Sequence, residues 1–392
     1  MSDTNPEKIK RLLSHAVEEI FVLESLEEKL LSGKNLRVKL GIDPTSSNIH
    51  IGRAVVLWKL REFQDMGHKV VFIVGDFTAL VGDPSDKLSK RPMLTVSEVK
   101  NNLKAYKKQV GKIINLKKAE FHYNSKWLKK LDFNDVAELA ECFSVQQMSH
   151  RRNFADRMER GEEISLREFL YPLMQGYDSV AIRADVELGG FDQLFNLKAG
   201  RVIQKHYGQP EQDIMVGVML EGTDGRKMSS SWGNIIGIDD EPNDMYGKTM
   251  SLSDDLIGKY FSLCTRLSEN EVREIISGSQ NPRDHKARLA YELVKLYHGE
   301  RQAKKAENNF ALAFQKRGIP ENIREIYFSP GDLLVNVLLT EKIISSKNDW
   351  KRLVSGGGIE INGEVVKNIY VMAEGAQLLR VGKKRFVKIK AK

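Results

Sequence analysis

Cysteine and long apolar runs are both scarce in this chain of 392 residues. The two cysteines, Cys142 and Cys264, belong to no metal-ligand spacing, and two thiols cannot form a disulfide framework. The most apolar stretch, 70–82, contains Asp76 and is too short to span a bilayer. The first eight residues lack the basic-then-apolar order of a secretory signal peptide. These absences predict a cytoplasmic protein with no membrane segment.

Charge, in contrast, is abundant. Charged residues make up 29% of the sequence, and the formal net charge is +8. Residues 330–392 hold twelve Lys or Arg against six Asp or Glu, so most of the excess positive charge lies in the C-terminal segment. Clustered cations that bind phosphates release counterions, which favours a polyanionic partner such as RNA. An ordinary solvated surface explains the same composition, and both interpretations stay open at this point.

Strand-like and helix-like segments alternate over the first 220 residues. Apolar runs rich in β-branched residues predict strands at 36–43, 69–77, 119–123, 185–188 and 214–220. Helical periodicity predicts several helices between 125 and 170, and others at 8–32, 50–66, 95–113 and 192–207. This alternation predicts an α/β fold with a Rossmann-type parallel sheet, which binds ligands at the carboxyl ends of its strands.

The pattern changes twice after residue 222. It is helical and polar through about 317, and Gly and Pro residues at 318–320 and 330–331 then indicate a linker. The last sixty residues combine two short helices, at 332–339 and 349–354, with β-type segments. We therefore expect three domains: a catalytic domain with a helical insertion at about 125–170, a helical domain that includes a charged loop, and a small α+β domain, at 1–222, 223–325 and 330–392.

The motif His50-Ile51-Gly52-Arg53 stands where a predicted strand gives way to a helix. Such a turn presents free backbone N–H groups and the positive end of a helix dipole, which suit a phosphate. Gly52 allows a nucleotide to approach the backbone closely, and His50 and Arg53 fall on one helix face. Donors placed there would stabilise charge that develops on an attacked α-phosphate. A buried histidine at a helix start is the alternative interpretation of this motif taken alone.

Three further segments carry polar groups in informative places. The second motif, 227–231 (Lys-Met-Ser-Ser-Ser), follows a Gly-rich charged loop. Tyr171, Gln175 and Asp178 share one face of an apolar helix, where polar groups are expensive to bury unless they meet a ligand. A solvated stripe is the alternative for that face. Residues 189–193 follow a strand and precede a helix, a position suited to a ribose or amino-acid contact.

Together and in this order, the two motifs resemble the ATP-handling signatures of class I aminoacyl-tRNA synthetases. Over nearly its whole length the chain resembles bacterial-type tyrosyl-tRNA synthetases. The resemblance implies a tyrosine–tRNA ligase, which activates L-tyrosine with ATP to tyrosyl-adenylate plus pyrophosphate and then transfers tyrosine to the 3′ end of tRNA(Tyr). It also implies Mg²⁺ with the ATP, no tightly bound protein metal, a homodimer, and an S4-like RNA-binding fold at the C-terminus.

The resemblance assigns roles position by position. Catalytic roles fall on His50, Arg53, Lys87, Arg91, Lys227, Ser230 and Thr45. Contacts with the substrate tyrosine fall on Lys39, Asp83, Asn124, Tyr171, Gln175, Asp178 and Gln193. Contacts with ATP fall on Asp43, Gly52, Gly190, Asp192, Met219, Leu220, Lys227 and Met228. Asp178 is the candidate acceptor for the phenol hydroxyl.

Five residues depart from the family pattern. Arg53 replaces a usual His, and Ser230 replaces the second lysine of the later motif, which leaves Lys227 as its main cation. Asp86 and Phe191 replace small residues, and Lys39 stands where many relatives have a tyrosine that touches the substrate phenol. Because both Arg and His donate to phosphate, we expect activity to survive the change at Arg53.

Two other functions remain open on the sequence alone. A synthetase-derived protein that has lost catalysis would still bind structured RNA through its basic C-terminal segment. A tryptophanyl enzyme would share the two motifs, but Asp178 and the S4-like segment argue against it, since a phenol and an indole N–H make different demands. Tyrosine-dependent exchange of pyrophosphate with ATP separates the ligase from the RNA-binding protein, and amino-acid competition in the same assay separates it from the tryptophanyl enzyme.

Overall fold

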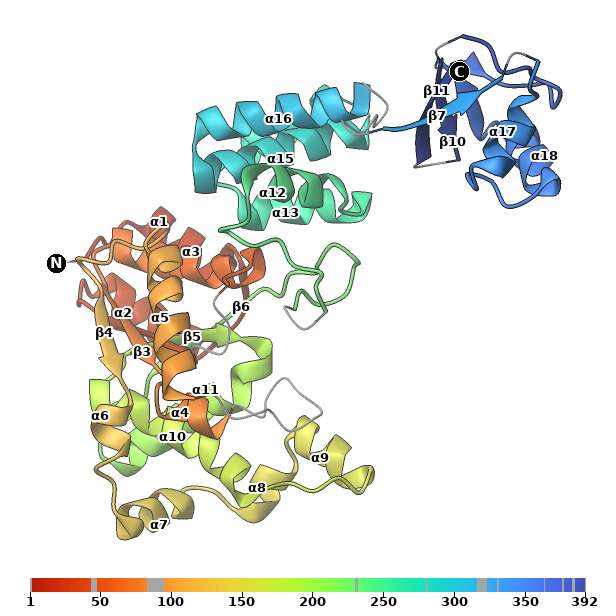
Figure 1. The fold of residues 1–392 in the computed structure, drawn as a ribbon. Coiled ribbons are helices and arrows are strands. Elements are labelled where there is room, and N and C mark those ends of the chain that lie inside the picture. The colour runs from red at the N-terminus through yellow and green to blue at the C-terminus, as the bar shows by residue number, and fades with distance from the viewer. Residues whose placement is uncertain are drawn as a thin grey trace. The chain divides into compact units, whose positions relative to one another are not determined.

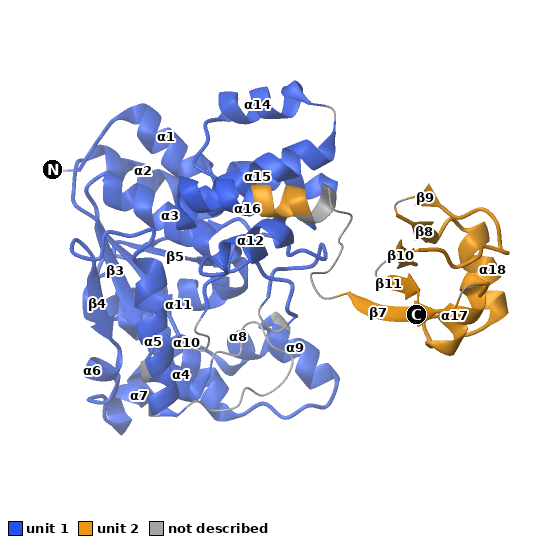
Figure 2. Cartoon of the chain, turned by 45° about the horizontal axis from the view of Figure 1, so that its top comes forward, with its two compact units in different colours: residues 1–307 blue, residues 308–392 orange. Residues whose placement is uncertain are grey.

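The structure is a computed structural model that describes most of the chain, namely residues 2–43, 48–82, 95–229, 232–279, 281–315, 323–329, 331–362, 364–375, 377–382 and 385–391. The chain divides into two compact units, residues 1–307 and 308–392, which are coloured separately in Figure 2. The predicted boundary near 222 lies inside the first unit, so the three-domain division stays a prediction. Among the described residues, no helix combines the length and hydrophobicity needed to cross a bilayer.

Unit 1 is built on a six-stranded sheet with the strand order β1-β6-β5-β2-β3-β4 (Figure 1). Five strands run parallel to one another: β2 (Arg37–Ile42), β3 (Lys69–Val74), β4 (Glu120–Tyr123), β5 (Val186–Gly190) and β6 (Asp213–Gly217). The strand order changes direction between β2 and β5, and such a switch point is where open parallel sheets bind ligands. The predicted Rossmann-type sheet and its five strands are confirmed.

One sequence prediction for this unit was wrong. Residues 8–32 do not form one helix but α1 (Pro6–Ser14), β1 (Val17–Phe21) and α2 (Leu23–Leu31). Ala16 and Val22 have positive φ values of 57° and 68°, which interrupt helical geometry on both sides of β1. β1 pairs antiparallel with β6, so its hydrogen bonds come from a strand far along the chain that a local pattern cannot reveal.

The helices of unit 1 follow the predicted segments closely. α3 packs on the sheet, α10 and α11 pack tightly on each other, and α11 also packs on β5 and β6. Ser165 and Glu168 form a capping box at the start of α10, and Thr95 and Glu98 do the same for α5. The helices near the sheet are α3 (Ile51–Asp65), α4 (Thr78–Val81), α5 (Val96–Val110), α6 (Ser125–Leu128), α7 (Phe133–Glu141), α8 (Val145–Ser149), α9 (Arg152–Glu159), α10 (Leu166–Ile182), η1 (Phe191–Gln193) and α11 (Leu194–His206).

A helical region follows the sheet, as the sequence predicts. α12 packs on α15, and α13 packs on α3, α14 and α15. Ser268 and Glu271 form a capping box that begins α14, while Pro residues at the starts of α12 and α15 suit the first helical turn. These helices are α12 (Pro242–Met250), η2 (Asp254–Leu256), α13 (Ile257–Cys264), α14 (Glu269–Gly278), α15 (Pro282–His298) and α16 (Glu300–Gln315).

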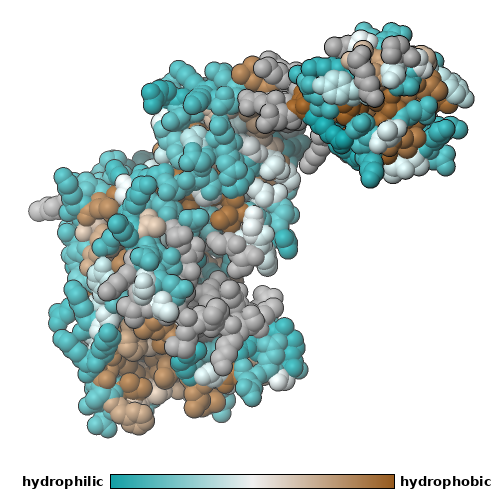
Figure 3. Space-filling view, in the orientation of Figure 1, coloured by the Kyte–Doolittle hydropathy of each residue, from teal (hydrophilic) through white to brown (hydrophobic). Residues whose placement is uncertain are grey.

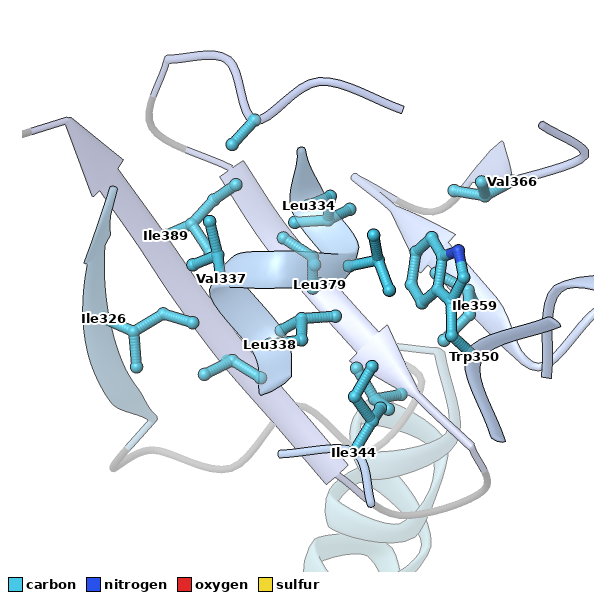
Figure 4. Packing of buried hydrophobic residues seen from close by; sticks show 14 of the residues in the cluster. Ile326, Leu334, Val337, Leu338, Ile344, Trp350, Ile359, Val366, Leu379 and Ile389 are labelled. Atoms are coloured by element: carbon cyan, nitrogen blue, oxygen red, sulfur yellow. The ribbon is translucent and has the colours of Figure 1, made fainter. Parts of the chain in front are cut away.

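Unit 2 has a core of its own beneath a five-stranded sheet with the order β7-β11-β10-β8-β9. Trp350 and Leu338, from two helices, pack with Ile359, Leu379 and Ile389 from three strands (Figure 4). This α+β arrangement fits the predicted S4-like fold. Its elements are β7 (Arg324–Phe328), α17 (Leu334–Thr340), α18 (Lys347–Ser355), β8 (Ile359–Ile361), β9 (Glu364–Val365), β10 (Gln377–Val381) and β11 (Arg385–Ala391).

Candidate active site

His50 caps the N-terminus of α3 and is almost completely buried. Its Nδ1 accepts a hydrogen bond of 3.3 Å from the backbone N–H of Arg53. Because a backbone N–H can only donate, Nδ1 carries no hydrogen and Nε2 carries it. Burial, followed by the nearby charges of Arg53 and Lys227, lowers the pKa of His50 to about 3. His50 is therefore a neutral donor through Nε2–H, and the positive charge at this helix start belongs to Arg53 and Lys227.

Gly52 lies where the two sequence motifs meet. A Cβ atom at Gly52 would stand 3.1 Å from Nδ1 of His50 and 3.4 Å from Sδ of Met228, so a side chain would crowd both. The segment after the second motif also pairs with the start of α3: the N–H of Ile51 donates to the carbonyl of Ile236 at 2.9 Å. Segments that are far apart in sequence are thus held together at one helix N-terminus.

Asn234 fixes the shape of the loop that carries the second motif. Its buried side chain accepts a hydrogen bond of 2.9 Å from the N–H of Ser229 and donates to Asp224 at 2.7 Å and to the carbonyl of Lys227 at 3.1 Å. The hydrogen bond from Asn234 is the largest cause that lowers the pKa of Asp224 to about 2. A single amide thus joins three points of the loop, and the sequence analysis did not identify it.

Lys227 projects from this loop toward the start of η1. Its Nζ lies 3.1 Å from a carboxylate oxygen of Asp192, and both side chains are partly exposed. Gly190, just before, leaves room for that carboxylate, because a Cβ there would approach Asp192 Oδ1 within 2.6 Å. The structure therefore brings together three residues that the sequence assigned to ATP.

A pocket of about 360 Å³ opens beside these residues. Its volume lies at the lower end of the usual range for small-molecule sites. Met219 is partly exposed in its wall, as expected for an apolar surface under a base, whereas Leu220 is buried. The pocket is lined by Glu18, Phe191, Val218, Met219, Glu221, Lys227 and Lys259.

Asp43, directly after β2, receives hydrogen bonds from two elements. The Tyr171 hydroxyl on α10 donates to one carboxylate oxygen at 2.7 Å, and the Thr78 hydroxyl on α4 donates to the other at 2.7 Å. Gly75 must lack a side chain here, since a Cβ would collide with Asp43 and Thr78. The carboxylate that the sequence assigned to ATP thus also orients Tyr171.

A second part of this network surrounds Asp178, which is buried on α10. The indole N–H of Trp127 donates to one carboxylate oxygen at 2.8 Å, and the side-chain amide of Asn124 lies 3.4 Å from the other. Asn124 also donates to Thr78 at 3.1 Å, so the hydrogen bonds run continuously from Asp178 to Asp43. Burial raises the pKa of Asp178 to about 7, against the opposing effects of Lys39 and of the donors Trp127 and Asn124.

Lys39 on β2 and Gln175 on α10 also belong to the positions that the sequence assigned to the substrate tyrosine. Lys39 is completely buried, and its Nζ contacts Glu187 at 2.9 Å, the carbonyl of Gln175 at 2.9 Å and the hydroxyl of Ser179 at 2.8 Å. The amide nitrogen of Gln175 donates to Glu187 at 3.2 Å. On α11, Asn196 donates to the side-chain oxygen of Gln193 at 3.1 Å.

Six positions from the sequence analysis lie outside the described residues, namely Thr45, Asp83, Asp86, Lys87, Arg91 and Ser230. Sequence reasoning missed Thr78, Trp127, Glu187 and Asn234. Trp127 follows the carboxyl end of β4 closely, and that position was the available signal for a residue near the site. Among the described residues, no group of three or more His, Cys, Asp or Glu side chains could hold a metal ion.

Comparison with known proteins places this geometry in context. A family model described as tRNA synthetases class I (W and Y) matches residues 31–315. The chain is 47% identical to a tyrosine–tRNA ligase of Thermotoga maritima, over 98% of each chain. It is 44% identical to a tyrosine–tRNA ligase of Carboxydothermus hydrogenoformans, over 98% of this chain and 97% of that one.

Solved structures share the fold at lower identity. A C-terminally truncated mitochondrial tyrosyl-tRNA synthetase of Aspergillus nidulans superposes with a TM-score of 0.65 at 24% identity, covering 79% of this chain and 93% of that chain. A tyrosyl-tRNA synthetase of Archaeoglobus fulgidus complexed with L-tyrosine gives a TM-score of 0.62 at 22% identity, covering 77% and 99%. At these identities the likeness concerns the fold alone.

Proposed function

Because this chain belongs to the class I tRNA synthetases and joins tyrosine to tRNA with the use of ATP, we propose which of its residues perform each step. The observation that carries the proposal is the continuous hydrogen-bond network from Asp178 to Asp43, which ends at the carboxyl end of β2. A tyrosine side chain on one side of this network and a triphosphate on the other would meet at the carboxyl edge of the sheet.

Tyrosine binds through both of its ends. Asp178 accepts a hydrogen bond from the phenol, and Asn124 and Trp127 hold its carboxylate in place. Tyr171 and the side-chain oxygen of Gln175 contact the ammonium group, while Gln193 faces the carboxylate. A buried acceptor left without a hydroxyl is unfavourable, which disfavours phenylalanine. Asp83, outside the described residues, completes this set.

ATP binds across Gly52, with its base over Met219 and its ribose at Asp192. The tyrosine carboxylate attacks the α-phosphate, a P–O bond forms, and the bond to pyrophosphate breaks. Nε2–H of His50 and the cations of Arg53 and Lys227 stabilise the negative charge that develops. Lys87, Arg91, Ser230 and Thr45 share this task from segments outside the described residues. Positioning and charge stabilisation supply most of the catalysis.

Mg²⁺ is part of this proposal as a companion of the ATP phosphates. Bound there, it would offset phosphate charge during the displacement. The tRNA 3′ end then takes the tyrosyl group, while the helical region and the basic unit 2 bind the tRNA body through phosphate contacts.

We also propose a homodimer in the cytoplasm, with catalytic, helical and RNA-binding domains at 1–222, 223–325 and 330–392. Phe133 on α7 is 88% exposed and Leu166 at the start of α10 is 82% exposed, with Val145 on α8 also exposed. Figure 3 shows hydrophobic surface over α7 and α10. Exposed hydrophobic surface of this kind favours an interface, and a second copy is the occupant we propose. Light scattering of Phe133→Asp, expected to be monomeric, tests it.

Pyrophosphate exchange into ATP, measured with each of the twenty amino acids, tests the whole assignment. Tyrosine alone is expected to support exchange. Exchange with tryptophan instead, or no exchange with any amino acid, would overturn the proposal. The two alternatives left open by the sequence are disfavoured by curated relatives, since matches at 41–47% identity over nearly the full chain are tyrosine–tRNA ligases.

A further inference from the structure

A completely buried ion pair lies beneath the proposed tyrosine site. Lys39 on β2 and Glu187 on β5 are directly opposite each other in the parallel register of the two strands. Their charged atoms are 2.9 Å apart, and the exposed fractions of the two side chains are 0% and 1%. Taking two charges out of water is unfavourable unless their partners compensate, so the pair needs an explanation beyond stability.

Protein atoms accept all the hydrogen bonds that the Lys39 ammonium group can donate, so Lys39 has no need of a ligand. Its ammonium group has three donors, and three acceptors surround it: Glu187, the Ser179 hydroxyl and the Gln175 carbonyl. The sequence places Lys39 among the residues that contact the substrate tyrosine, and its three protein acceptors favour an indirect role instead. Lys39 instead connects β2 and β5 to α10, the helix that presents Tyr171, Gln175 and Asp178.

Glu187 determines which end of the Gln175 amide faces the site. The nitrogen of that amide donates to Glu187 at 3.2 Å, so the amide oxygen is the atom turned away from the ion pair. An oxygen is what a substrate ammonium group requires, because an ammonium only donates. Gln212 donates to the other oxygen of Glu187, which holds the carboxylate itself in one orientation.

The charge of Lys39 acts on Asp178. Lys39 is the cation that favours the ionised form of this carboxyl, whereas Glu187 disfavours it. Ionisable side chains on the strands and strand ends around α10 include Arg37 on β2, Asp43 after β2, Asp76 after β3 and the pair Glu120 and His122 on β4, and α7 and α11 carry further charged residues. Arg37 donates to the carbonyl of Ile182 at 2.8 Å and pairs with Glu120. Asp43 and Asp76 are occupied by hydroxyl donors, and His122 lies beside Glu120. Among the charges that act on the Asp178 carboxyl, Lys39 is the buried cation and Glu187 the buried anion.

We propose that the Lys39–Glu187 pair is a positioning element for tyrosine recognition: Glu187 orients the Gln175 amide toward the substrate ammonium, and Lys39 supplies a buried positive charge against α10, the helix that carries the phenol acceptor Asp178. Neither residue touches the substrate. This inference rests on the proposed tyrosine site and adds two residues that select tyrosine indirectly, through the residues that contact it.

The variants Lys39→Met, Glu187→Gln and their combination test the charge effect. The measurement is the pH profile of kcat/KM for tyrosine in pyrophosphate exchange, which reports ionisations of the free enzyme. Loss of Lys39 should move the acidic limb to higher pH by about one unit or more, and Glu187→Gln should move it to lower pH. The double variant should fall between them and is the one most certain to fold, because it leaves no unpaired buried charge.

Substrate discrimination provides the second readout. In Lys39→Met at neutral pH, the ratio of kcat/KM for tyrosine to that for phenylalanine should fall about tenfold or more, while KM for ATP stays unchanged. Lys59→Met is the matched control. Lys59 is also buried, with a carbonyl at 2.8 Å and a carboxylate at 2.6 Å, but it does not belong to the network around Asp178. Lys59→Met should leave unchanged both the acidic limb of the pH profile and the ratio of kcat/KM for tyrosine to that for phenylalanine.

The outcomes separate this inference from the function that it depends on. If the wild-type protein showed no tyrosine-dependent exchange of pyrophosphate into ATP, the proposed function would be wrong. An active wild type whose pH limb and tyrosine preference are the same in Lys39→Met, or in the double variant if the single one does not fold, would overturn this inference alone. Equal shifts in Lys59→Met would show that general destabilisation is responsible.

Discussion

The two sides of the proposed site are built in opposite ways. On the tyrosine side, Asp178, Asn124 and Lys39 are buried, and protein atoms bond to their polar groups in two neighbouring sets of contacts, one around Asp178 and one around Lys39. On the nucleotide side, Lys227 and Asp192 are partly exposed and hold each other in an ion pair. Exposed ion pairs of this kind stabilise by only about 0–1 kcal/mol, so phosphate and ribose can replace them at little cost.

This difference suggests how one sheet edge serves two substrates. A small amino acid must be distinguished from close analogues, which requires rigid, buried polar groups. ATP brings a large charge of its own, so its side of the site can rely on adaptable loops and a helix N-terminus. Variants on the tyrosine side should therefore change specificity, and variants on the nucleotide side should change rate or nucleotide affinity.

The largest effect is expected for Asp178→Asn. Removing the phenol acceptor should lower kcat/KM for tyrosine by at least about 10²-fold and abolish the preference over phenylalanine. A site built to bond a hydroxyl rejects the analogue lacking it by roughly 10⁴–10⁵-fold; tyrosyl-tRNA synthetases are the known example of that ratio, which is not inferred from this geometry. Asp213→Asn is the control, since Asp213 is equally buried and paired with Lys29 at the opposite end of β6. A preserved tyrosine preference in Asp178→Asn would remove the distinction between the two sides.

His50→Ala should lower the rate of adenylate formation with little change in the affinity for tyrosine. Loss of one preorganised donor to a developing anion typically costs about 10²–10³ in rate. Because the donating atom is Nε2–H of a neutral ring, His50→Gln should retain part of the activity. His68→Ala is the matched control, since His68 is also buried and its pKa is also lowered by burial. Pre-steady-state adenylate formation measures both quantities, and an equal loss in tyrosine affinity would contradict this role.

The pH dependence of kcat/KM for tyrosine should show which side of the site carries the titrating group. With the pKa of Asp178 raised to about 7 and that of His50 lowered to about 3, the acidic limb of kcat/KM for tyrosine should have its midpoint near 7 and fall about tenfold per unit below it. His50→Gln should keep that limb. If His50→Gln instead removed or shifted this acidic limb, the titrating group would lie on the nucleotide side of the site.

The same ionisation has a consequence for stability, with a definite sign. The folded protein holds the Asp178 proton more tightly than the unfolded chain, because its pKa is raised from 3.8. The stabilisation is fully present below the unfolded pKa and is lost as the pH rises through about 7. Asp178→Asn should therefore raise the thermal midpoint relative to wild type more at pH 8 than at pH 5.

Asn234→Ala should loosen the loop without removing any contact with substrate. Losing the hydrogen bonds to Ser229 and Asp224 should raise KM for ATP about 10- to 30-fold, since each buried hydrogen bond contributes roughly 1 kcal/mol. KM for tyrosine should not change. Asn281→Ala removes an exposed capping amide at the start of α15, outside the loop that carries the second motif, and serves as the control. Equal increases in KM for ATP and KM for tyrosine would show that the loop contributes to binding on both sides of the site.

The smallest effect is expected for Phe191→Ser. Phe191 lines the pocket beside Met219 but is half exposed, so its removal should raise KM for ATP only about two- to threefold. Steady-state exchange at varied ATP measures this. Stronger binding of ATP in the variant would mean that Phe191 obstructs the pocket rather than lining it.

The local sequence pattern predicted the parallel strands correctly because each strand leaves its signal within its own residues. Each parallel strand is a short apolar run, and α3 begins directly after His50, where the motif predicts it. The strand β1 was missed because it exists only through pairing with β6. Its residues on their own resemble a helical continuation of α1 and α2.

The candidate site was predicted residue by residue, but its connections were not. Tyr171 and Asp178 were recognisable as polar residues on an apolar helix face. The sequence could not show that Tyr171 donates to Asp43, or that Trp127 donates to Asp178, because these pairs form only when the sheet brings β2, β4 and α10 together. The protonation of His50 likewise depends on burial and on one backbone N–H, neither of which is visible in a motif.

The antiparallel strand at the sheet edge has a consequence for the behaviour of the protein in concentrated solution. An unpaired edge is a template on which strands of other chains can add, and charged side chains discourage that growth. β1 occupies one edge and exposes Glu18 and Glu19. Its two glutamates should therefore protect the enzyme from aggregating through that edge.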